Sequence, residues 1–375
     1  MPYLTPSDRR IEAPPRPVQF IKKQISILDA EVDTLIRVRK ARQAFGVSGG
    51  GLAAAVLDTG LRVTHRDFRG RVPAGRNFTP DNGGNPDDVS DGNGHGTNVA
   101  GIIAANDIHV GVAPGVSVVP LKVLTNAGGG DFGSILQALD WVLAEHQNHN
   151  ISIVSMSLGD TSNGADDSVH ALDPIRERIL QLRALNIPVV VAAGNDYFHF
   201  KAEGMGYPAI LNETISVGAV YDANEGPFVY RSGAEAHSTA ADRLTPFSQR
   251  LHETTNSRTR TDIFAPGAPV TSSGIDSDEG ESVQQGTSQA TPVVTGVLLL
   301  MQEFFRRSTQ LLPSVDLLGQ CLRSGGVKIL DGDDEDDNVP HTQKQFLRVD
   351  AVLALDAVRR KLQQHLFSTH KAFSK

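Results

Sequence analysis

Three short segments carry an aspartate, a histidine and a serine where these residue types could catalyse acyl transfer. Asp58 directly follows the apolar run 52–57, His95 lies between two glycines, and Ser288 begins an apolar helical run. A serine hydroxyl is a weak nucleophile unless a nearby base removes its proton. Histidine suits that task because its ordinary pKa lies near 6.5, and a buried carboxylate would hold the imidazole in the correct tautomer.

Each segment also has a purely structural interpretation. Asp58 could be a turn or helix-capping aspartate, His95 a hydrogen-bonded histidine at a helix start, and Ser288 an ordinary N-cap. A simple cap does not explain the Gly-Thr pair before Ser288 or Pro292 four residues after it. The three segments together therefore favour catalysis over three unrelated caps.

The elements that would position these residues alternate between strands and helices. Strands are predicted at 52–57, 116–123, 151–156, 188–193 and 214–220, and helices at 132–146, 173–185 and 288–307. This alternation predicts an α/β fold with a three-layer, mostly parallel, doubly wound sheet covered by helices on both faces. Catalytic sites in such sheets form at the carboxyl ends of the strands. Helical spacing also covers residues 20–45, and the arginine-containing segment 250–260 predicts an inserted surface loop.

The composition is that of a globular protein without a nucleic-acid or membrane partner. The 375 residues carry a net charge of -8, which argues against binding to nucleic acid or anionic lipid. The longest apolar run is too short to cross a bilayer, and no signal-peptide core is visible. A single cysteine, Cys321, fits a reducing compartment. The cytoplasm is thus the expected location, with a secreted form not excluded by sequence and the oligomeric state left open.

Over residues 36–355 the chain resembles the subtilisin-like serine peptidases, the subtilase family, and within it the intracellular subtilisins. The three segments match the family's motifs in the order aspartate, histidine, serine, and segment 189–196 resembles the strand and turn that supply its oxyanion-hole asparagine. The resemblance implies hydrolysis of polypeptide substrates through an acyl-enzyme, without a cofactor for the chemistry. The implied roles are nucleophile for Ser288, general base and acid for His95, orientation of the histidine for Asp58, and an oxyanion-hole donor for Asn195.

The resemblance also implies a substrate cleft. One edge would pair with the substrate backbone, a pair of glycines would form the opposite edge, and small residues would line a roomy, mainly apolar pocket for the residue before the cut. The first edge is Ser157, Leu158 and Gly159, the opposite edge is Gly129 and Gly130, and the pocket residues are Ala192, Ala193, Gly194 and Gly206.

Calcium is the one ion that the resemblance implies. Asp67 matches a calcium ligand of the family, yet the loop that would complete the site, residues 106–110, is short. Structural calcium at Asp67 therefore stays an open expectation. The acidic stretches 81–91 and 331–337 could also supply carboxylate oxygens, although such loops are commonly only solvated surface. Asn98, Gln289 and Val293 depart from the family's usual residues outside the triad and do not predict an inactive enzyme.

Three segments are expected: an N-terminal extension at 1–35, a peptidase domain at 36–358 and a tail at 359–375. Pro2-Tyr3 resembles an element with which the extension of intracellular subtilisins blocks the cleft, so residues 1–19 are predicted to regulate access. Two other functions were weighed against an active endopeptidase. A catalytically silent subtilase fold that binds peptides has no need for the triad and Asn195 together, and a serine esterase would need a Gly-x-Ser-x-Gly elbow that Ser288 lacks.

Overall fold

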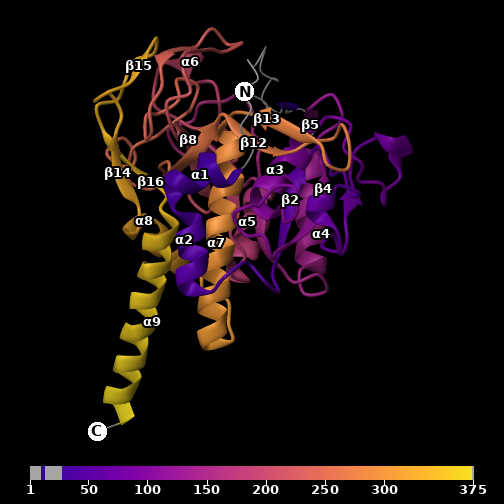
Figure 1. Cartoon of the computed structure of the whole chain (residues 1–375), viewed down its shortest axis with the longest axis vertical. Helices are drawn as coiled ribbons and strands as arrows, with labels where there is room; N and C mark the ends of the chain where they lie inside the picture. Colours follow the sequence, from indigo (N-terminus) through magenta and orange to yellow (C-terminus); the bar gives the residue numbers. More distant parts are fainter. Residues whose placement is uncertain (1–9, 13–27, 374–375) are drawn as a thin grey trace.

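A computed structural model describes residues 10–12 and 28–373, and within them a large sheet forms the centre of the molecule (Figure 1). Its strand order is β14-β16-β11-β8-β7-β6-β2-β4-β3. All neighbouring strands are parallel except β14 with β16. The strands are β2 (Ala53–Asp58), β3 (Arg76–Asn77), β4 (Ser117–Lys122), β6 (Ile151–Met156), β7 (Val189–Ala192), β8 (Ile215–Tyr221), β11 (Ile263–Ala268), β14 (Val327–Leu330) and β16 (Gln345–Arg348).

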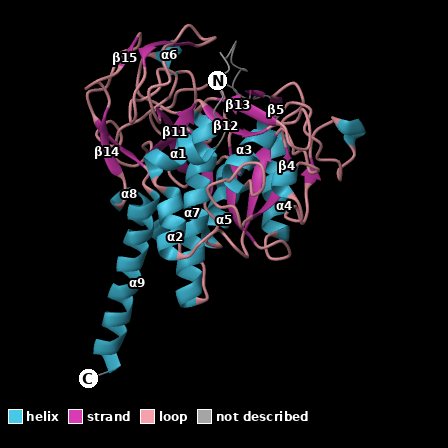
Figure 2. Ribbon diagram, in the orientation of Figure 1, coloured by secondary structure: helices cyan, strands magenta, loops and turns pink. Residues whose placement is uncertain are grey.

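Helices cover both faces of this sheet, which confirms the predicted three-layer α/β architecture (Figure 2). Successive residues of β2 point to opposite faces: Ala54 and Val56 pack in one core cluster with α3 and α7, while Ala55 and Leu57 pack in the other with α4 and α5. The helices are α1 (Leu28–Ile36), α2 (Val38–Phe45), α3 (His95–Ala104), α4 (Phe132–Glu145), α5 (Pro174–Ala184), α6 (Tyr197–Phe200), α7 (Thr287–Thr309), α8 (Val315–Ser324) and α9 (Ala351–Phe373).

Within the described residues, three smaller sheets lie outside the main sheet. A two-stranded pair joins β1 (Arg10–Glu12) to β5 (Gly129–Asp131), and another joins β12 (Val270–Ser273) to β13 (Glu281–Gln284). The third small sheet contains β15 (Asp336–Asp337), β10 (Glu235–Ser238) and β9 (Phe228–Val229). Short 3₁₀ helices lie at Arg66–Phe68, Asn82–Gly84 and Ser168–His170.

The predicted strands of the main sheet, and the predicted helices that cover it, agree with the observed ones to within two residues at each end. The helical prediction for residues 20–45 is correct for residues 28–45, but the structure has two helices there where one was expected. Arg37, with φ of 59°, separates α1 from α2, and residues 20–27 lie outside the described part of the chain. Val32 and Ile36 pack in the main core, so the end of the predicted extension is joined to the peptidase fold.

The C-terminal part of the chain completes one edge of the sheet through β14 and β16 and then forms α9. This helix packs beside α2, α7 and α8 and extends beyond the body of the molecule in Figure 1. It runs unbroken across residues 358 and 359, while the division into three segments stays a prediction. No helix in the described residues is both long and apolar enough to cross a membrane.

The prediction of a surface loop at residues 250–260 is wrong at its first residue. Residues 253–255, 257 and 258 are exposed, as expected, yet the Arg250 side chain is only 1% exposed. Its guanidinium pairs with Asp331, which is itself fully buried, so the charge is compensated inside the protein. A sequence pattern of polar residues cannot reveal a partner that lies 81 residues away.

Candidate active site

Asp58 is the last residue of β2, at the carboxyl end of an interior strand that lies between β6 and β4. Its side chain is 1% exposed, and Oδ1 accepts hydrogen bonds from His95 Nδ1 at 2.7 Å and from the backbone N–H of Thr59 at 2.7 Å. Its other oxygen, Oδ2, is buried without a hydrogen-bond partner in the described residues. The carboxylate can therefore fix the Nδ1-protonated tautomer of the histidine.

His95 is the first residue of α3 and is 4% exposed. A glycine must follow it, because a Cβ at Gly96 would lie 2.3 Å from the carbonyl oxygen of Gly60. Burial alone would lower the pKa of His95, but the charge of Asp58 and its hydrogen bond outweigh burial and raise the pKa above its ordinary value. Nε2 is buried and has no hydrogen-bond partner in the described residues.

Asp91 organises the turn that presents His95, and sequence reasoning did not assign it this role. One carboxylate oxygen accepts from the N–H groups of Asn93 and Gly94, and the other accepts from the N–H and hydroxyl of Thr97. An aspartate followed by Asn-Gly at this spacing is typical of a turn in which the side chain bonds the backbone. The sequence signal was therefore present four residues before His95.

Ser288 lies in the first turn of α7, directly after Thr287 and the glycine Gly286, whose φ is 149°. Pro292 lacks the N–H that would bond the Ser288 carbonyl in a regular helix. The hydroxyl of Ser157 donates to that carbonyl instead, at 2.7 Å. In return, the Ser288 hydroxyl donates to the Ser157 carbonyl at 3.1 Å. The structural role of Pro292 is therefore to leave the Ser288 carbonyl free to accept the hydrogen bond from Ser157. A serine that served only as a helix cap would not need this proline.

Asn195 follows β7, and its side chain points toward the start of α7. Its Oδ1 accepts from the backbone N–H of Thr287 at 2.9 Å and from the Thr287 hydroxyl at 3.0 Å. Because the amide is planar, these two bonds direct Nδ2 away from Thr287. Asn195, Ser288 and Thr287 all line one cavity, so the structure brings the predicted oxyanion donor and the predicted nucleophile together.

A match to the subtilase family covers residues 49–313, which contain Asp58, His95, Asn195 and Ser288. The chain belongs to the subtilase family. Among curated relatives, the major intracellular serine protease of Bacillus subtilis (strain 168) is 33% identical over 296 residues, 77% of this chain and 81% of the relative. The intracellular serine protease of Paenibacillus polymyxa is 33% identical over 301 residues, 78% and 80% of the two chains. Subtilisin DY of Bacillus licheniformis is 31% identical over 271 residues, 71% and 82%.

The cavity of this subtilase contains four of the predicted substrate residues, Leu158, Gly159, Ala192 and Gly194. Ala193 does not line it, because alternation along the chain turns its side chain into the core under the sheet, where it is fully buried. Gly206 is also buried and donates its N–H to the Ala193 carbonyl at 2.9 Å. The prediction of a mainly apolar lining is incomplete, since ionisable side chains also line the cavity: Asp160, Asp196, His199 and Arg231.

Of the two predicted edges of the cleft, one follows a strand of the main sheet, and the other is already paired with another strand. Ser157–Gly159 directly follows β6, and Leu158 is 2% exposed. Gly129 and Gly130 form β5, which pairs antiparallel with β1, with Ile11 opposite Gly130 and Glu12 opposite Gly129. The backbone of residues 10–12 therefore occupies the edge that was assigned to substrate.

Two departures from the usual subtilase residues contact each other. Gln289 Nε2 donates to Asn98 Oδ1 at 3.3 Å, and Asn98 Nδ2 donates to the Ser282 hydroxyl at 2.9 Å. Both side chains are fully buried. The pair therefore links α3 to α7 without using His95 or Ser288, although Gln289 Oε1 is buried without a hydrogen-bond partner in the described residues.

Asp67, the predicted calcium ligand, is fully buried, and protein donors surround it. Oδ2 accepts from His109 Nδ1 at 2.7 Å and from the Ser273 hydroxyl at 2.6 Å, while Oδ1 accepts from the His109 N–H at 2.9 Å. Burial would raise the pKa of Asp67, but the hydrogen bonds from His109 and Ser273 outweigh it and lower the pKa to about 2. Calcium prefers six to eight oxygen ligands, so donors and a histidine at this position do not fit the ion.

The acidic stretches give a similar result for their buried members. The carboxylate oxygens of Asp91 and Asp331 accept hydrogen bonds from protein donors. The remaining grouping in the second stretch is Asp333, Asp334 and Glu335, of which the two aspartates are exposed. Such an exposed acidic group is ordinary surface and gives no ground for a metal site.

Proposed function

We propose that Ser288, His95 and Asp58 carry the reaction of this chain, a serine endopeptidase of the subtilase family. The observation that supports these roles is the buried hydrogen bond of 2.7 Å between His95 Nδ1 and Asp58 Oδ1. It leaves the opposite nitrogen, Nε2, buried and without a partner in the described residues. Buried polar atoms are nearly always paired, and the serine proton is the partner that catalysis would supply.

The reaction begins when the Ser288 hydroxyl turns from the Ser157 carbonyl toward His95 Nε2. Catalytic hydrogen bonds are commonly loose or absent before substrate binds. The Ser288 oxygen attacks the peptide carbonyl carbon while His95 takes the hydroxyl proton, and the carbonyl electron pair moves onto oxygen. His95 then returns the proton to the leaving amine as the carbon–nitrogen bond breaks, and a water molecule hydrolyses the acyl-enzyme by the same two steps.

Asn195 is proposed to stabilise the oxyanion of both tetrahedral intermediates. Its Oδ1 is held by Thr287, so Nδ2 is the group available to donate to the substrate oxygen. The Ser288 N–H is the second donor, because the first amides of a helix lack intrahelical acceptors. The helix N-terminus adds a favourable dipole for the negative charge.

Labelling with a fluorophosphonate tests the nucleophile. The folded chain should form a covalent phosphonyl adduct that peptide mapping places on Ser288, and Ser288→Ala should form none. Ser277→Ala is the matched control, since it removes the hydroxyl of an exposed serine outside the proposed site and should still label. Labelling of Ser288→Ala, or no labelling of the folded wild type, would contradict the assignment.

The substrates, location and regulation of the enzyme are further parts of this proposal. Leu158, Gly159, Ala192 and Gly194 are proposed to contact a polypeptide substrate, and the cytoplasm is the proposed location because two relatives are named as intracellular proteases. Residues 1–19 are proposed to limit access to the cleft. Pro2-Tyr3 lies outside the described residues, so support comes from β1, whose backbone pairs with β5.

A further inference from the structure

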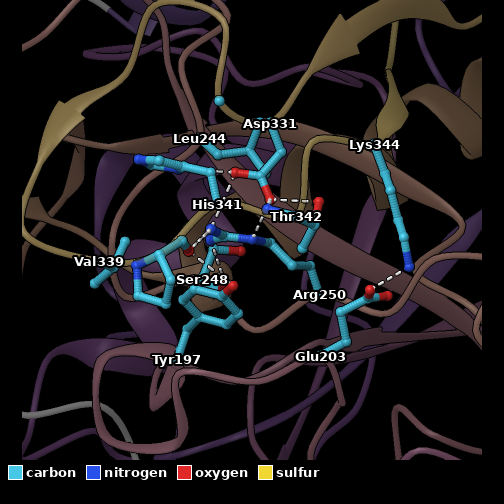
Figure 3. Close-up of polar contacts among 12 residues, drawn as sticks. Tyr197, Glu203, Leu244, Ser248, Arg250, Asp331, Val339, His341, Thr342 and Lys344 are labelled. Atoms are coloured by element: carbon cyan, nitrogen blue, oxygen red, sulfur yellow. Dashed lines mark hydrogen bonds and ion pairs between the residues drawn. The ribbon is translucent and has the colours of Figure 1, made fainter.

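A buried ion pair joins Arg250 to Asp331 beside the ring of Tyr197 (Figure 3). Arg250 is 1% exposed and Asp331 is fully buried, and two parallel bonds join them, Nε to Oδ2 at 2.9 Å and Nη2 to Oδ1 at 3.0 Å. Asp331 lies beyond residue 313, where the match to the family model ends. This pair therefore joins the family-matched part of the chain to the segment between β14 and β16.

Asp331 is held in place by three more donors. His341 Nδ1 lies 3.1 Å from Oδ1, and the N–H and hydroxyl of Thr342 donate to Oδ2 at 2.9 and 2.7 Å. The other ring nitrogen of His341 lies 3.3 Å from Asp337. These contacts fix the carboxylate, so the position of the Arg250 guanidinium is fixed as well.

Arg250 in turn contacts the loop after β7. Its guanidinium carbon lies 3.5 Å from the centre of the Tyr197 ring, two residues after Asn195. The Tyr197 hydroxyl donates to the Pro340 carbonyl at 2.9 Å, so the C-terminal segment holds this side chain directly too. Tyr197 is 2% exposed and cannot move outward without breaking this packing.

The neighbour of Arg250 holds the other side of the same loop. The N–H of Gln249 donates to the Gly194 carbonyl at 2.9 Å, and its side-chain oxygen accepts from the Asp196 N–H at 3.4 Å. A Cβ at Gly194 would lie 1.9 Å from that oxygen. Gln249 therefore touches the residues immediately before and after Asn195.

We propose that the Asp331–Arg250 ion pair positions the oxyanion hole by holding Gln249 and Arg250 against residues 194–197, and so fixes Asn195. Asp331 is then a positioning residue that acts through Asn195, in a part of the chain outside the matched family region. This inference rests on the role proposed above for Asn195. Misplacing a catalytic group by about 1 Å can cost roughly a hundredfold in rate.

A double-mutant cycle separates positioning from general stability. The proteins are the wild type, Asp331→Asn, Asn195→Ala and the double variant, and kcat and KM are measured with a chromogenic tetrapeptide on protein shown to be folded by circular dichroism. Asp331→Asn should lower kcat by roughly 10- to 100-fold and change KM by less than about twofold. Asn195→Ala should lower kcat by roughly 100- to 1,000-fold, the loss typical of one oxyanion-hole donor, as in subtilisin. The double variant should match Asn195→Ala within about twofold.

Asp333→Asn is the matched control, because it makes the same charge change on an exposed residue of the same turn and should leave kcat unchanged. Normal kcat in Asp331→Asn, or an equal fall in both backgrounds, would overturn the inference. Normal kcat in Asn195→Ala would instead overturn the proposed role of Asn195. If Asp331→Asn does not fold, the cycle is repeated with Thr342→Val, which removes one hydrogen bond to Asp331, and a smaller fall in kcat that vanishes without Asn195 is expected.

Discussion

At the scale of single residues, the active site depends on polar atoms that are buried without partners. Asp58 Oδ2 and His95 Nε2 are both in this state within the described residues. Leaving a buried polar group unpaired costs about 1–3 kcal/mol, so the fold tolerates a cost at two atoms of the proposed catalytic residues. Such costs are typical of functional sites.

The pKa of His95 gives a prediction at this scale. His95 must be neutral to take the serine proton, so kcat/KM should rise with pH through its pKa, at a midpoint above the ordinary value of about 6.5. In Asp58→Asn, burial still lowers the pKa while the main raising charge is lost, so the His95 midpoint should move to lower pH. The maximal kcat should fall by about four orders of magnitude.

Imidazole proton NMR across pH 5 to 9 measures the His95 midpoint even where the variant is nearly inactive. Asp87→Asn is the control, because Asp87 is 81% exposed and the same charge change there should not move the midpoint. An unchanged His95 midpoint in Asp58→Asn would contradict the proposed electrostatic role of Asp58.

The sequence indicates the proposed catalytic residues more clearly than the residues that hold them in position. Asp58, His95 and Ser288 were recognisable because each is an unusual residue in a marked context of strand ends and glycines. Asp91 holds the turn before His95 and had a local signal, the Asp-Gly-Asn-Gly sequence. Thr287 instead bonds Asn195, 92 residues away in the chain, and nothing in its residue type reveals that contact. The Ser157–Ser288 exchange depends on the approach of β6 to α7, which no local pattern encodes.

At the scale of elements, periodicity explains what could be predicted. The central strands are continuous apolar runs because both faces are buried, and they end near their predicted limits. The surface prediction for Arg250 failed because burial of a charge depends on a distant partner. The pairing of β1 with β5 is similarly invisible in sequence, since three residues of strand carry no periodic signal.

That pairing leads to the prediction for the N-terminal segment. If residues 10–12 occupy the substrate edge, removing residues 1–19 should free β5. KM for a tetrapeptide should then fall at least about threefold, because a closed fraction of molecules weakens apparent binding in proportion. The value of kcat should stay within about twofold, since the triad is untouched.

Steady-state kinetics of the shortened and full chains measure this effect. A variant that lacks residues 366–375 is the control for truncation, because the end of α9 extends away from β5 (Figure 1). Equal KM values for the full chain and the variant lacking residues 1–19 would count against a regulatory arm.

At the scale of the whole molecule, Asp67 joins segments that are distant in sequence. It lies in the 3₁₀ helix at Arg66–Phe68, bonds His109 after α3, and bonds Ser273 at the end of β12. In this subtilase His109 and Ser273 donate hydrogen bonds to the Asp67 oxygens that would otherwise be free to bind a calcium ion. Stability at this point should therefore come from protein hydrogen bonds and should not depend on an added cation.

The melting temperature of the wild type should be the same with EDTA as with added calcium. Asp67→Asn should lower the unfolding free energy by about 1–3 kcal/mol, because a buried donor of His109 or Ser273 loses its acceptor. Thermal unfolding of both proteins, with Asp87→Asn as the exposed control, measures the two effects together. If EDTA lowers the melting temperature of the wild type but not that of Asp67→Asn, then Asp67 binds a cation and the hydrogen-bonded arrangement is not the one that stabilises the fold. If EDTA leaves both unchanged and only Asp67→Asn is less stable, His109 and Ser273 provide the link between these segments.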